Sequence, residues 1–460
     1  MELTIKEILE ATGGELISGS ELASAERISI DSRKIRAGEL FVAIKGDSFD
    51  GHSFINGAVV KGAIGAIVEK VPDLKTAPPS FSLIKVKDTL HALGSIANFQ
   101  RRRSKAKILA ISGTTGKTTT KEMLAAILER GVKTLKTQGN MNNLIGLPLT
   151  LFGLEEDHKA AVVELGISET GEMKRLAEIT APDVVLITNI GRGHLKELHS
   201  LEGVAREKAE LYAALGKDGI MVVNADDKWA MHAAKQGGER QTITYGISEG
   251  VDVQIEETTP DGLKGLDVKY NVRGTELSVR FNSPLISNPY NGAAAIAMVL
   301  AGGFDLKDAA VALGAIPPMS GRMEVLRTKG LTLVDDTYNS NPDSLEAALR
   351  TLAGADGRRV VVLGDMLELG EGSREAHLEA GSLAADLGFE VVVAVGRWAG
   401  ETSKAATEGG VGIVFECGNN HEAGEKLREV LEENDTVLVK GSRAGKMEEI
   451  VGVIKELTIA

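Results

Sequence analysis

A glycine-rich turn stands between an apolar run and a helix-forming run, and its residue types suit phosphate binding. The stretch ILAISGTTGKTTTKEM spans residues 108–123. The apolar run at 108–111 predicts a buried strand, and the residues from Lys117 onward predict a helix. Backbone N–H groups in such a turn and at a helix N-terminus bind anions. The candidates to contact a nucleotide phosphate are Gly113, Thr114, Thr115, Gly116, Lys117, Thr118 and Thr119.

Two side chains of this GxxGKT stretch have distinct expected roles. The amine of Lys117 can reach the β- and γ-phosphates, and the hydroxyl of Thr118 can ligate Mg²⁺. Ile111 occupies the place of the first glycine in the full GxxxxGK[ST] pattern, so the stretch is a shorter form. Its position between a predicted strand and a predicted helix favours a nucleotide site over a chance match.

Two further predicted strands end in side chains that can bind a metal. Glu164 ends the apolar run 159–163, and an acidic side chain beside a phosphate loop can hold the metal that bridges the phosphates. His194 follows the next strand in a glycine-flanked turn. A surface charge at Glu164 and an ordinary packed histidine at His194 are the alternative interpretations, and the residue pattern leaves both open.

Lys208 falls on the apolar stripe of the helix predicted after Ser200. It stands four residues after Val204 and four before Tyr212. A lysine on an apolar face costs free energy unless it is paired or neutralised. The simpler interpretation is a stem that carries the amine to solvent. The alternative is that the desolvated amine reacts with CO₂ and that the carbamate binds a metal beside His194.

Polar side chains at later element boundaries form a third group of candidates. Asn288 and Asn291, three residues apart at a predicted helix start, either cap that helix or bind the edge of an adenine. Arg322 lies where a third domain is expected to begin, and from there it could neutralise a γ-phosphate. Asp336 and Asn339 follow a strand end in the run DDTYNSNPDS, which has more polar residues than a turn needs. We therefore expect them at a ligand site.

The elements that must position these residues predict an α/β protein of three domains. Apolar runs that alternate with helical stretches indicate parallel sheets with helices on both faces, and ligands bind at the carboxyl ends of such strands. The expected domains are a smaller α/β domain at 1–104, the nucleotide-binding domain at 105–316 and a Rossmann-like domain at 317–460. Residues 250–285 alternate as antiparallel strands do. We also expect Thr4 to cap the first helix with Glu7, and Ser344 to cap the helix after DDTYNSNPDS.

Composition and charge limit the classes of function. A chain of 460 residues, 43% hydrophobic and 25% charged, suits a soluble multidomain protein, and its first ten residues lack the apolar core of a signal peptide. The single cysteine, Cys417, excludes an internal disulfide framework, and the formal net charge of −13 argues against a nucleic-acid binder. The basic run at 101–103 is interpreted as a solvated helix end. We expect a cytoplasmic protein that binds neither nucleic acid nor membrane.

Over essentially its whole length the chain resembles the Mur ligase family of peptidoglycan synthesis. Motifs similar to those of the family occur in the family order, namely GTTGKTTT, VVELG, TNIGRGHL, REKAELY, NPYN, SGRMEVL and DDTYNSNPDS. GNMNNLIGLPLTL from Gly139, LGDMLELG from Leu363 and VKGSRAGKMEEIV from Val439 are most similar to the member that adds D-alanyl-D-alanine. FVAIKGDSFDGHSFI from Phe41 looks like the first domain, which binds the UDP-linked substrate.

The resemblance implies an ATP-dependent amide ligation carried out by a cytoplasmic monomer. ATP would phosphorylate the terminal carboxylate of UDP-N-acetylmuramoyl-tripeptide, and the amine of D-alanyl-D-alanine would attack the acyl phosphate. Two Mg²⁺ ions are implied. Thr118 and Glu164 would bind one ion, and His194 with a carbamylated Lys208 would bind the second.

The resemblance also implies roles for the remaining motif residues. Lys117 and Arg322 would bind the phosphates, Asn288 and Asn291 would contact adenine, and Asp336 would contact the ribose. Lys117, Arg322, His194 and Lys208 are thus the implied catalytic residues. The implied substrate-binding residues are Asp31, Ser32, Arg33, Lys45, Gly46, Asp50, His52, Asn140, Asn142, Asn143, Tyr338, Asn339 and Asn341.

Three other interpretations compete with this one. The nearest is another Mur-type amino-acid ligase or a folylpolyglutamate ligase, against which DDTYNSNP and GDMLELG argue. A P-loop GTPase would need an Asn-Lys-x-Asp motif, and the chain has no Asn-Lys pair. A non-catalytic UDP-sugar-binding scaffold would leave the glycine-rich turn, Glu164 and His194 without a role.

Overall fold

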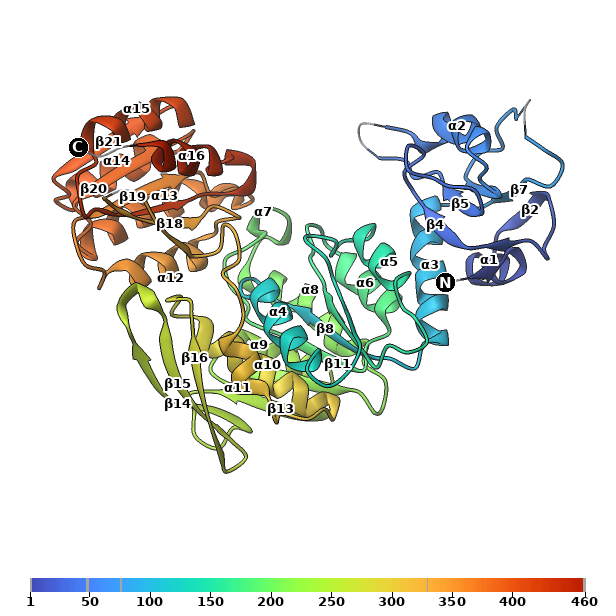
Figure 1. Cartoon of the computed structure of the whole chain (residues 1–460), viewed down its shortest axis with the longest axis horizontal. Helices are drawn as coiled ribbons and strands as arrows, with labels where there is room; N and C mark the ends of the chain where they lie inside the picture. Colours follow the sequence, from blue (N-terminus) through green and yellow to red (C-terminus); the bar gives the residue numbers. More distant parts are fainter. Residues whose placement is uncertain (1, 47–48, 75–76, 329, 458–460) are drawn as a thin grey trace.

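Three large sheets, one in each, divide the chain into three α/β domains, as the sequence predicts. The computed structural model describes residues 2–46, 49–74, 77–328 and 330–457. Figure 1 shows a bent molecule in which the middle domain connects the N-terminal domain on one side with the C-terminal domain on the other. The three-domain α/β architecture is therefore confirmed. In the described part of the chain no helix is long and apolar enough to cross a bilayer.

The N-terminal domain contains a five-stranded sheet of order β2-β7-β6-β5-β4, in which only β2 runs antiparallel. A two-stranded sheet, β1-β3, lies beside it. The strands are β1 (Leu3–Thr4), β2 (Glu15–Ser18), β3 (Ser24–Ala25), β4 (Arg27–Ser29), β5 (Glu39–Val42), β6 (Gly65–Val68) and β7 (Ser82–Lys85). The helices are α1 (Ile5–Thr12), α2 (Ile55–Val60) and α3 (Thr89–Arg103).

The middle domain contains a nine-stranded sheet of order β16-β15-β14-β13-β12-β11-β8-β10-β9. Strands β8 to β14 are parallel to one another, whereas the pairs β14-β15 and β15-β16 are antiparallel. The strands are β8 (Lys107–Ser112), β9 (Thr134–Lys136), β10 (Ala160–Glu164), β11 (Val184–Ile187), β12 (Ile220–Asn224), β13 (Gln241–Gly246), β14 (Val253–Pro260), β15 (Leu266–Val272) and β16 (Thr275–Phe281). The antiparallel pattern expected at 250–285 is confirmed, although β14 also pairs in parallel with β13.

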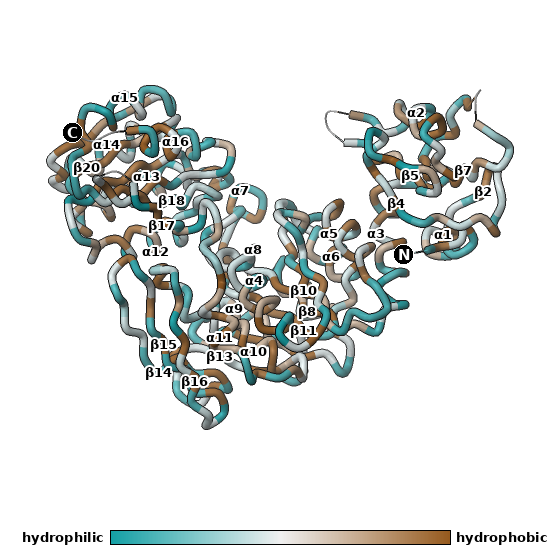
Figure 2. Tube along the Cα trace, in the orientation of Figure 1, coloured by the Kyte–Doolittle hydropathy of each residue, from teal (hydrophilic) through white to brown (hydrophobic). Residues whose placement is uncertain are grey.

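Helices cover both faces of this sheet. They are α4 (Lys117–Leu128), α5 (Gly146–Leu151), α6 (Glu172–Thr180), α7 (Leu195–Leu198), α8 (Leu201–Ala213), α9 (Lys228–Gln236), α10 (Asn288–Gly302) and α11 (Ala309–Gly314). Side chains of β8 alternate between the faces, so that Leu109 and Ile111 pack with α4 and α10, and Ile108 and Ala110 pack with α5, α6 and α8. Figure 2 shows the hydrophobic residues gathered along β8, β10, β11 and α10.

The C-terminal domain contains a six-stranded sheet of order β17-β18-β22-β19-β20-β21, parallel except at β17. Its strands are β17 (Glu324–Arg327), β18 (Thr332–Asp336), β19 (Arg359–Gly364), β20 (Val391–Val395), β21 (Ile413–Cys417) and β22 (Thr436–Lys440). Its helices are α12 (Pro342–Leu352), α13 (Ser373–Asp386), α14 (Ala399–Glu408), α15 (Asn420–Val430) and α16 (Glu448–Glu456), with a short 3₁₀ turn, η3 (Gly370–Gly372).

Helix α3 joins the first two domains, and this corrects the interpretation of the basic run. Arg101 is buried, and its guanidinium donates to Thr180 O at 3.2 Å and to Asp183 Oδ2 at 2.8 Å. The interpretation as a solvated helix end was wrong for Arg101, because this side of α3 packs against the middle domain. Arg102 and Arg103 are exposed, as expected.

Two helix starts test the capping predictions. The capping box at α1 is confirmed, since Glu7 N donates to Thr4 Oγ1 at 3.2 Å and Thr4 N donates to Glu7 Oε2 at 2.8 Å. At α12 the prediction was wrong. Asn341 is the N-cap, and Ser344 is its partner three residues later. The pair satisfies both backbone donors, so Asn341 caps a helix that begins at Pro342.

Candidate active site

The glycine-rich turn predicted to bind phosphate connects the end of β8 to the start of α4. Gly113 and Gly116 have φ values of +145° and +78°, which side-chain-bearing residues rarely adopt. A Cβ at Gly113 would collide with Thr188 Oγ1, and one at Gly116 would collide with Asn291 Oδ1. Both glycines are therefore required by close approach as well as by backbone conformation.

Residues after β11 hold the turn from the side. Thr115 N donates to Asn189 Oδ1 at 2.9 Å, and Asn189 Nδ2 donates to Thr115 Oγ1 at 2.9 Å. Thr188 Oγ1 donates to Thr115 O at 2.6 Å. The sequence reasoning did not assign Thr188 and Asn189. Their position directly after β11, the parallel neighbour of β8, was the available signal.

Lys117 folds back over the turn that precedes it. Its Nζ donates to Gly113 O at 2.8 Å and to Thr114 O at 3.1 Å. Burial lowers the pKa of this amine, while the nearby Glu164 carboxylate opposes that change. The amine is thus positioned at the mouth of the turn, where it can exchange carbonyl partners for phosphate oxygens.

Glu164, Thr118 and Asn142 form a compact cluster at the carboxyl end of β10. Glu164 is only 3% exposed, and its Oε2 accepts from Thr118 Oγ1 at 2.9 Å. Its Oε1 accepts from Asn142 Nδ2 at 2.8 Å. Carboxylate, hydroxyl and amide oxygens are the donors that Mg²⁺ prefers, so this set fits one Mg²⁺ ion. The structure brings together the two predicted ligands, Thr118 and Glu164.

The other asparagines of this segment have different surroundings. Asn143 Oδ1 accepts from Ile145 N at 3.2 Å and from Gly146 N at 2.9 Å, which closes the turn before α5. Asn140 is exposed, and its carbonyl accepts from Asn142 N at 2.8 Å. Of the predicted substrate-binding set, Asn142 is thus the one that contacts the metal-ligand candidates.

Lys121 is a buried charge that the sequence reasoning missed. Its Nζ donates to Thr137 O at 2.8 Å, lies 3.0 Å from Glu122 Oε1 and lies 4.0 Å from Glu164 Oε2. Thr137 Oγ1 in turn accepts from Glu164 N at 3.0 Å. Lys121 therefore ties α4 to the segment that leads to Asn142. The only signal for this role in the sequence was that Lys121 falls on the inner side of the predicted helix.

Lys208 is buried in the middle domain. It is 1% exposed, and its Nζ donates to Gly113 O at 3.1 Å, directly beneath the phosphate turn. The interpretation as a stem reaching solvent was wrong, because the side of α8 that carries Lys208 packs onto the sheet. Burial, together with the charge of Lys117, holds the pKa of the Lys208 amine well below its usual value. The neutral amine is the form that reacts with CO₂, so the site fits carbamylation.

His194 lies immediately before α7. The neighbouring Gly193 lies so close to Thr114 that a Cβ there would come within 2.9 Å of Thr114 Cγ2. His194 Nδ1 lies 2.8 Å from Glu368 Oε2 of the C-terminal domain. An imidazole near oxygen donors suits a divalent metal. The structure therefore places Lys208, and the residue before His194, beside residues 113–114.

Asn288 and Asn291 belong to the body of α10, which begins at Asn288. The capping alternative was wrong, because the N-cap position is Ser287 and neither asparagine caps the helix. Asn291 Oδ1 accepts from Thr120 Oγ1 at 3.4 Å, while its buried Nδ2 has no hydrogen-bond partner among the described residues. An unpaired buried amide beside Gly116 is suited to a ligand donor–acceptor group.

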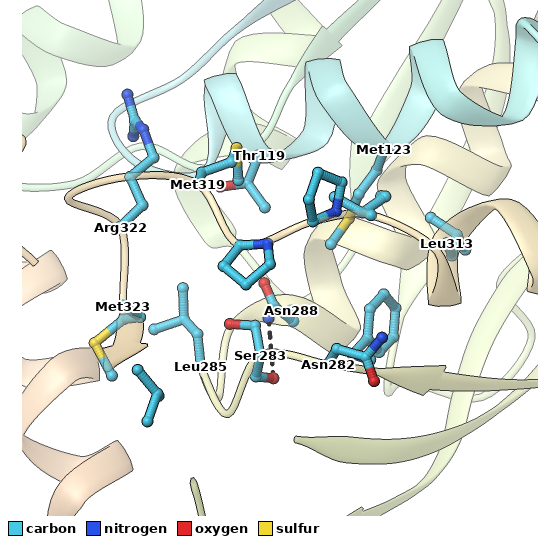
Figure 3. A pocket seen from close by; sticks show the side chains of 15 residues that line it. Thr119, Met123, Asn282, Ser283, Leu285, Asn288, Leu313, Met319, Arg322 and Met323 are labelled. Carbon is cyan, nitrogen blue, oxygen red and sulfur yellow. Dashed lines mark hydrogen bonds between the residues drawn. The ribbon is translucent and has the colours of Figure 1, made fainter. Parts of the chain in front are cut away.

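Asn288, but not Asn291, lines a pocket between α4, the start of α10 and the segment that leads into the C-terminal domain (Figure 3). The Nδ2 of Asn288 donates to Ser283 O at 3.4 Å. The walls are mostly apolar, and they include Met123, Phe281, Leu285, Leu313, Met319 and Met323. Apolar walls with a few polar groups fit a flat heterocyclic base.

Arg322 lines the same pocket, and its side chain points out of it (Figure 3). Its Nη2 donates to Thr118 Oγ1 at 3.1 Å. Its guanidinium carbon lies 3.8 Å from the centre of the Tyr338 ring. Tyr338, a predicted substrate residue, thus supports Arg322 by a cation–π contact. The arginine places a second cation beside the candidate Mg²⁺ ligand Thr118.

The predicted residues after β18 have protein partners in this structure. Asp336 Oδ2 pairs with Lys440 Nζ at 2.5 Å, and Asp336 Oδ1 accepts from Met323 N at 3.1 Å. Asn339 O also accepts from Lys440 Nζ, at 3.0 Å. Asn341 uses its side chain to cap α12. Ligand roles for these three remain predictions, and the buried Lys440 is a further residue that the sequence reasoning missed.

The N-terminal candidates gather at the carboxyl ends of β4 and β5, which are parallel neighbours. Asp31 accepts from Arg33 Nε at 2.9 Å, and this contact lowers the pKa of Asp31 to about 2. Lys61 Nζ donates to Ser32 O at 2.9 Å and to Arg33 O at 2.8 Å. These contacts order the loop after β4.

The loop after β5 carries the second half of the cluster. The backbones of Lys45 and Asp50 form an isolated antiparallel β-bridge, and Gly46 N donates to Phe49 O at 2.9 Å. His52 Nδ1 lies 2.6 Å from Asp50 Oδ1, and its Nε2 accepts from Glu69 N at 2.9 Å. Residues 47–48 of this motif lie outside the described residues. Figure 1 shows these loops in the N-terminal domain, away from the phosphate turn.

Comparisons with known proteins match all three domains. The model described as "Mur ligase family, catalytic domain" matches residues 24–101, "Mur ligase middle domain" matches 111–299, and "Mur ligase, glutamate ligase domain" matches 321–443. The chain is 32% identical to the UDP-N-acetylmuramoyl-tripeptide--D-alanyl-D-alanine ligase of Escherichia coli K12, over 99% of both chains. It is also 32% identical to the ligase of the same name from Bacillus subtilis 168, over 97% of both.

Solved structures give the same similarity in three dimensions. MurF from Acinetobacter baumannii superimposes with a TM-score of 0.91 at 32% identity, over 99% of both chains. The MurF ligase from Thermotoga maritima, solved in complex with ADP, has a TM-score of 0.82 at 26% identity, over 94% of this chain and 97% of that one. A folylpolyglutamate synthase from Mycobacterium tuberculosis shares the fold at 16% identity and a TM-score of 0.64, over 79% of this chain.

Proposed function

This chain belongs to the Mur ligase family, and we propose that it is the ATP-dependent ligase that joins D-alanyl-D-alanine to UDP-N-acetylmuramoyl-tripeptide. The observation that carries this proposal is similarity to curated ligases of that activity over 99% of both chains. All three domains of those ligases thus have counterparts here. The alternative of a folylpolyglutamate ligase is less well supported, because that likeness extends to the fold alone.

The proposed reaction activates a carboxylate before it forms an amide. The terminal carboxylate of the tripeptide attacks the γ-phosphorus of ATP, which gives an acyl phosphate and ADP. The amine of D-alanyl-D-alanine attacks the acyl carbon and loses a proton. The tetrahedral intermediate collapses with loss of inorganic phosphate, so one amide bond forms for each ATP cleaved.

The first step requires two anions to approach each other, and cationic side chains reduce their repulsion. Backbone N–H groups of residues 113–118 would surround the phosphates. The amine of Lys117 would bind the β- and γ-phosphates from one side. Arg322, already hydrogen-bonded to Thr118 Oγ1 at 3.1 Å, would neutralise the transferring γ-phosphoryl group from the other.

Two Mg²⁺ sites are part of the proposal. Thr118 and Glu164 would hold one ion, and the oxygen donors around Glu164 fit that assignment. His194 and a carbamylated Lys208 would hold the second. When bound, the ions would supply Lewis-acid stabilisation of charge on the phosphates and the carboxylate. Carbamylation converts a buried amine, which cannot stay charged without cost, into an oxygen ligand.

Adenine and ribose would lie near the pocket of Figure 3. Asn288 and Asn291 would contact the adenine edge, and Asp336 would contact the ribose across the domain junction. The unpaired Nδ2 of Asn291 supports the adenine assignment.

The three domains would divide the substrates between them. Residues 1–104 would bind the UDP group through the loops after β4 and β5, residues 105–316 would bind ATP, and residues 317–460 would bind the incoming dipeptide. The enzyme would act as a monomer in the cytoplasmic steps of peptidoglycan precursor synthesis.

Phosphate release distinguishes this proposal from its competitors. With ATP, Mg²⁺ and UDP-N-acetylmuramoyl-tripeptide, we expect release to depend on added D-alanyl-D-alanine. Release that ignores both substrates would reduce the protein to a P-loop ATPase. Release sustained by glutamate or by a single amino acid in place of the dipeptide would indicate a sister ligase.

A further inference from the structure

One loop of the C-terminal domain reaches the middle domain beside His194. It follows β19, and two backbone contacts fix it to its own domain. Met366 N donates to His377 Nε2 at 3.0 Å, and Leu367 N donates to Ser442 Oγ at 2.9 Å. The next residue, Glu368, therefore projects across the domain junction from an ordered support.

Glu368 meets the middle domain through both its backbone and its side chain. Lys196 N donates to Glu368 O at 3.1 Å. Glu368 Oε2 lies 2.8 Å from His194 Nδ1, but the ring is not aligned on that oxygen, so the buried Nδ1 has no completed hydrogen bond. A rotation of the imidazole would complete it. The backbones of Lys196 and Glu368 are in contact, and a change of ring orientation would complete the side-chain contact.

Both His194 and Glu368 have an unusual backbone conformation. His194 has φ of +57° and Glu368 has φ of +64°, in the left-handed region that side-chain-bearing residues seldom occupy. Such conformations are kept where surrounding structure requires a particular side-chain direction, and they concentrate at functional sites. Gly370 allows the close approach, because a Cβ there would lie 3.0 Å from Lys196 Cα.

We propose that Glu368 is a positioning residue that orients His194 for metal binding when the C-terminal domain is docked. The inference rests on the proposed function, because it takes His194 as a metal ligand. A carboxylate facing Nδ1 holds the proton on that nitrogen and leaves the Nε2 lone pair for the metal. The second metal site is then complete only after the domain proposed to bind the dipeptide has docked.

The test uses full-length protein, Mn²⁺ as the probe ion and ADP, with bound Mn²⁺ measured by electron paramagnetic resonance. Glu368→Gln preserves the shape of the side chain and removes its charge. Glu371→Gln is the matched control, because Glu371 is an exposed glutamate in the adjoining turn η3. His194→Ala identifies which Mn²⁺ site depends on the imidazole.

We expect Glu368→Gln to weaken the His194-dependent Mn²⁺ site by about tenfold or more, the usual effect of removing a carboxylate behind a histidine ligand. The other Mn²⁺ site and the KM for ATP should stay unchanged, kcat should fall, and Glu371→Gln should match the wild type. In the His194→Ala background, Glu368→Gln should cause no further loss.

Three outcomes would overturn the inference. The first is a Glu368→Gln titration equal to that of Glu371→Gln. The second is a further loss in the double variant, which would show that Glu368 acts through domain docking alone. The third is an unchanged number of Mn²⁺ sites in His194→Ala. In that third case dipeptide-dependent phosphate release by the wild type would still support the ligase, so the two proposals fail separately.

Discussion

Three lysines lie close to the phosphate turn, and their partners explain their different expected roles. Lys121 has a carboxylate at 3.0 Å and a carbonyl at 2.8 Å, so it is a structural cation. Lys117 binds two carbonyls of the turn itself and can exchange them for phosphate. Lys208 has a carbonyl at 3.1 Å, and among the described residues it forms no ion pair. A buried amine in that position is stable only when neutral or chemically modified.

Replacement of Lys208 tests the carbamate directly. We expect Lys208→Ala to lose about two orders of magnitude in kcat, because a charge-stabilising group is removed, and a short-chain carboxylic acid to restore part of it. Lys121→Ala is the control, since its loss is structural and the same acid should not rescue it. A folded Lys208→Ala protein that no acid reactivates would contradict the carbamate.

The sign of the pH dependence follows from the lowered pKa of Lys208. A base with a lowered pKa loses its proton at a lower pH than an exposed lysine does. Carbamate formation from ¹³C-bicarbonate should therefore begin well below the pH that exposed lysines require. Carbon-13 NMR of the loaded protein would detect it, and a signal that appears only near the pH of ordinary lysines would contradict the expectation.

The strand–turn–helix of β8 and α4 is the element on which nucleotide binding depends. Its turn packs against Thr188 and Asn189 after β11 and against Asn291 of α10. Both glycines have positive φ, and both lack room for a Cβ. The conformation of the turn is thus set by neighbours far away in sequence.

A single methyl group should disturb this turn. Gly116→Ala combines an unfavourable φ with a collision at Asn291, a cost of about 1–3 kcal/mol. We expect the Kd for ADP, measured by isothermal titration calorimetry, to rise about tenfold to a hundredfold. Gly131→Ala at the end of α4 is the matched control, because a Cβ there meets no atom within 4 Å. Equal affinities of the two variants would contradict the role of the turn.

The sequence predicted these elements because they depend on local pattern. Apolar runs identify β8, β10 and β11, and Thr4 with Glu7 identifies the start of α1. Partners across domains carry no local signal. Glu368 stands in the LGDMLELG motif, which indicated the resemblance but no role for this residue. Its proximity to His194 follows only from how two domains dock. The capping error at α12 has a different, local cause: Asn341 and Ser344 are both good caps, and only the backbone conformation shows which of them is the N-cap.

The molecule as a whole is arranged so that the C-terminal domain can approach the nucleotide. Arg192 of the middle domain pairs with Asp343 at 3.0 Å and with Glu379 at 2.6 Å in the C-terminal domain. Arg322 and Glu368 make the other contacts described above. Because water hydrolyses an acyl phosphate, an enzyme of this mechanism gains from closing the domains around it.

We therefore predict closure of the C-terminal domain about a hinge near Pro317-Pro318. Small-angle X-ray scattering should show a smaller radius of gyration when nucleotide and UDP-N-acetylmuramoyl-tripeptide are added together. Lys117→Ala with the same ligands should keep the profile of the unliganded protein. A wild-type profile that the ligands leave unchanged would contradict domain closure.

The measurement to make first is mass spectrometry of both products, with ¹⁸O in the terminal carboxylate of UDP-N-acetylmuramoyl-tripeptide. Phosphorylation of that carboxylate predicts a UDP product that gains D-alanyl-D-alanine and loses one labelled oxygen, and inorganic phosphate that carries this oxygen. Unlabelled phosphate, or a UDP substrate of unchanged mass after ATP is consumed, would contradict carboxylate activation and with it the proposed ligase.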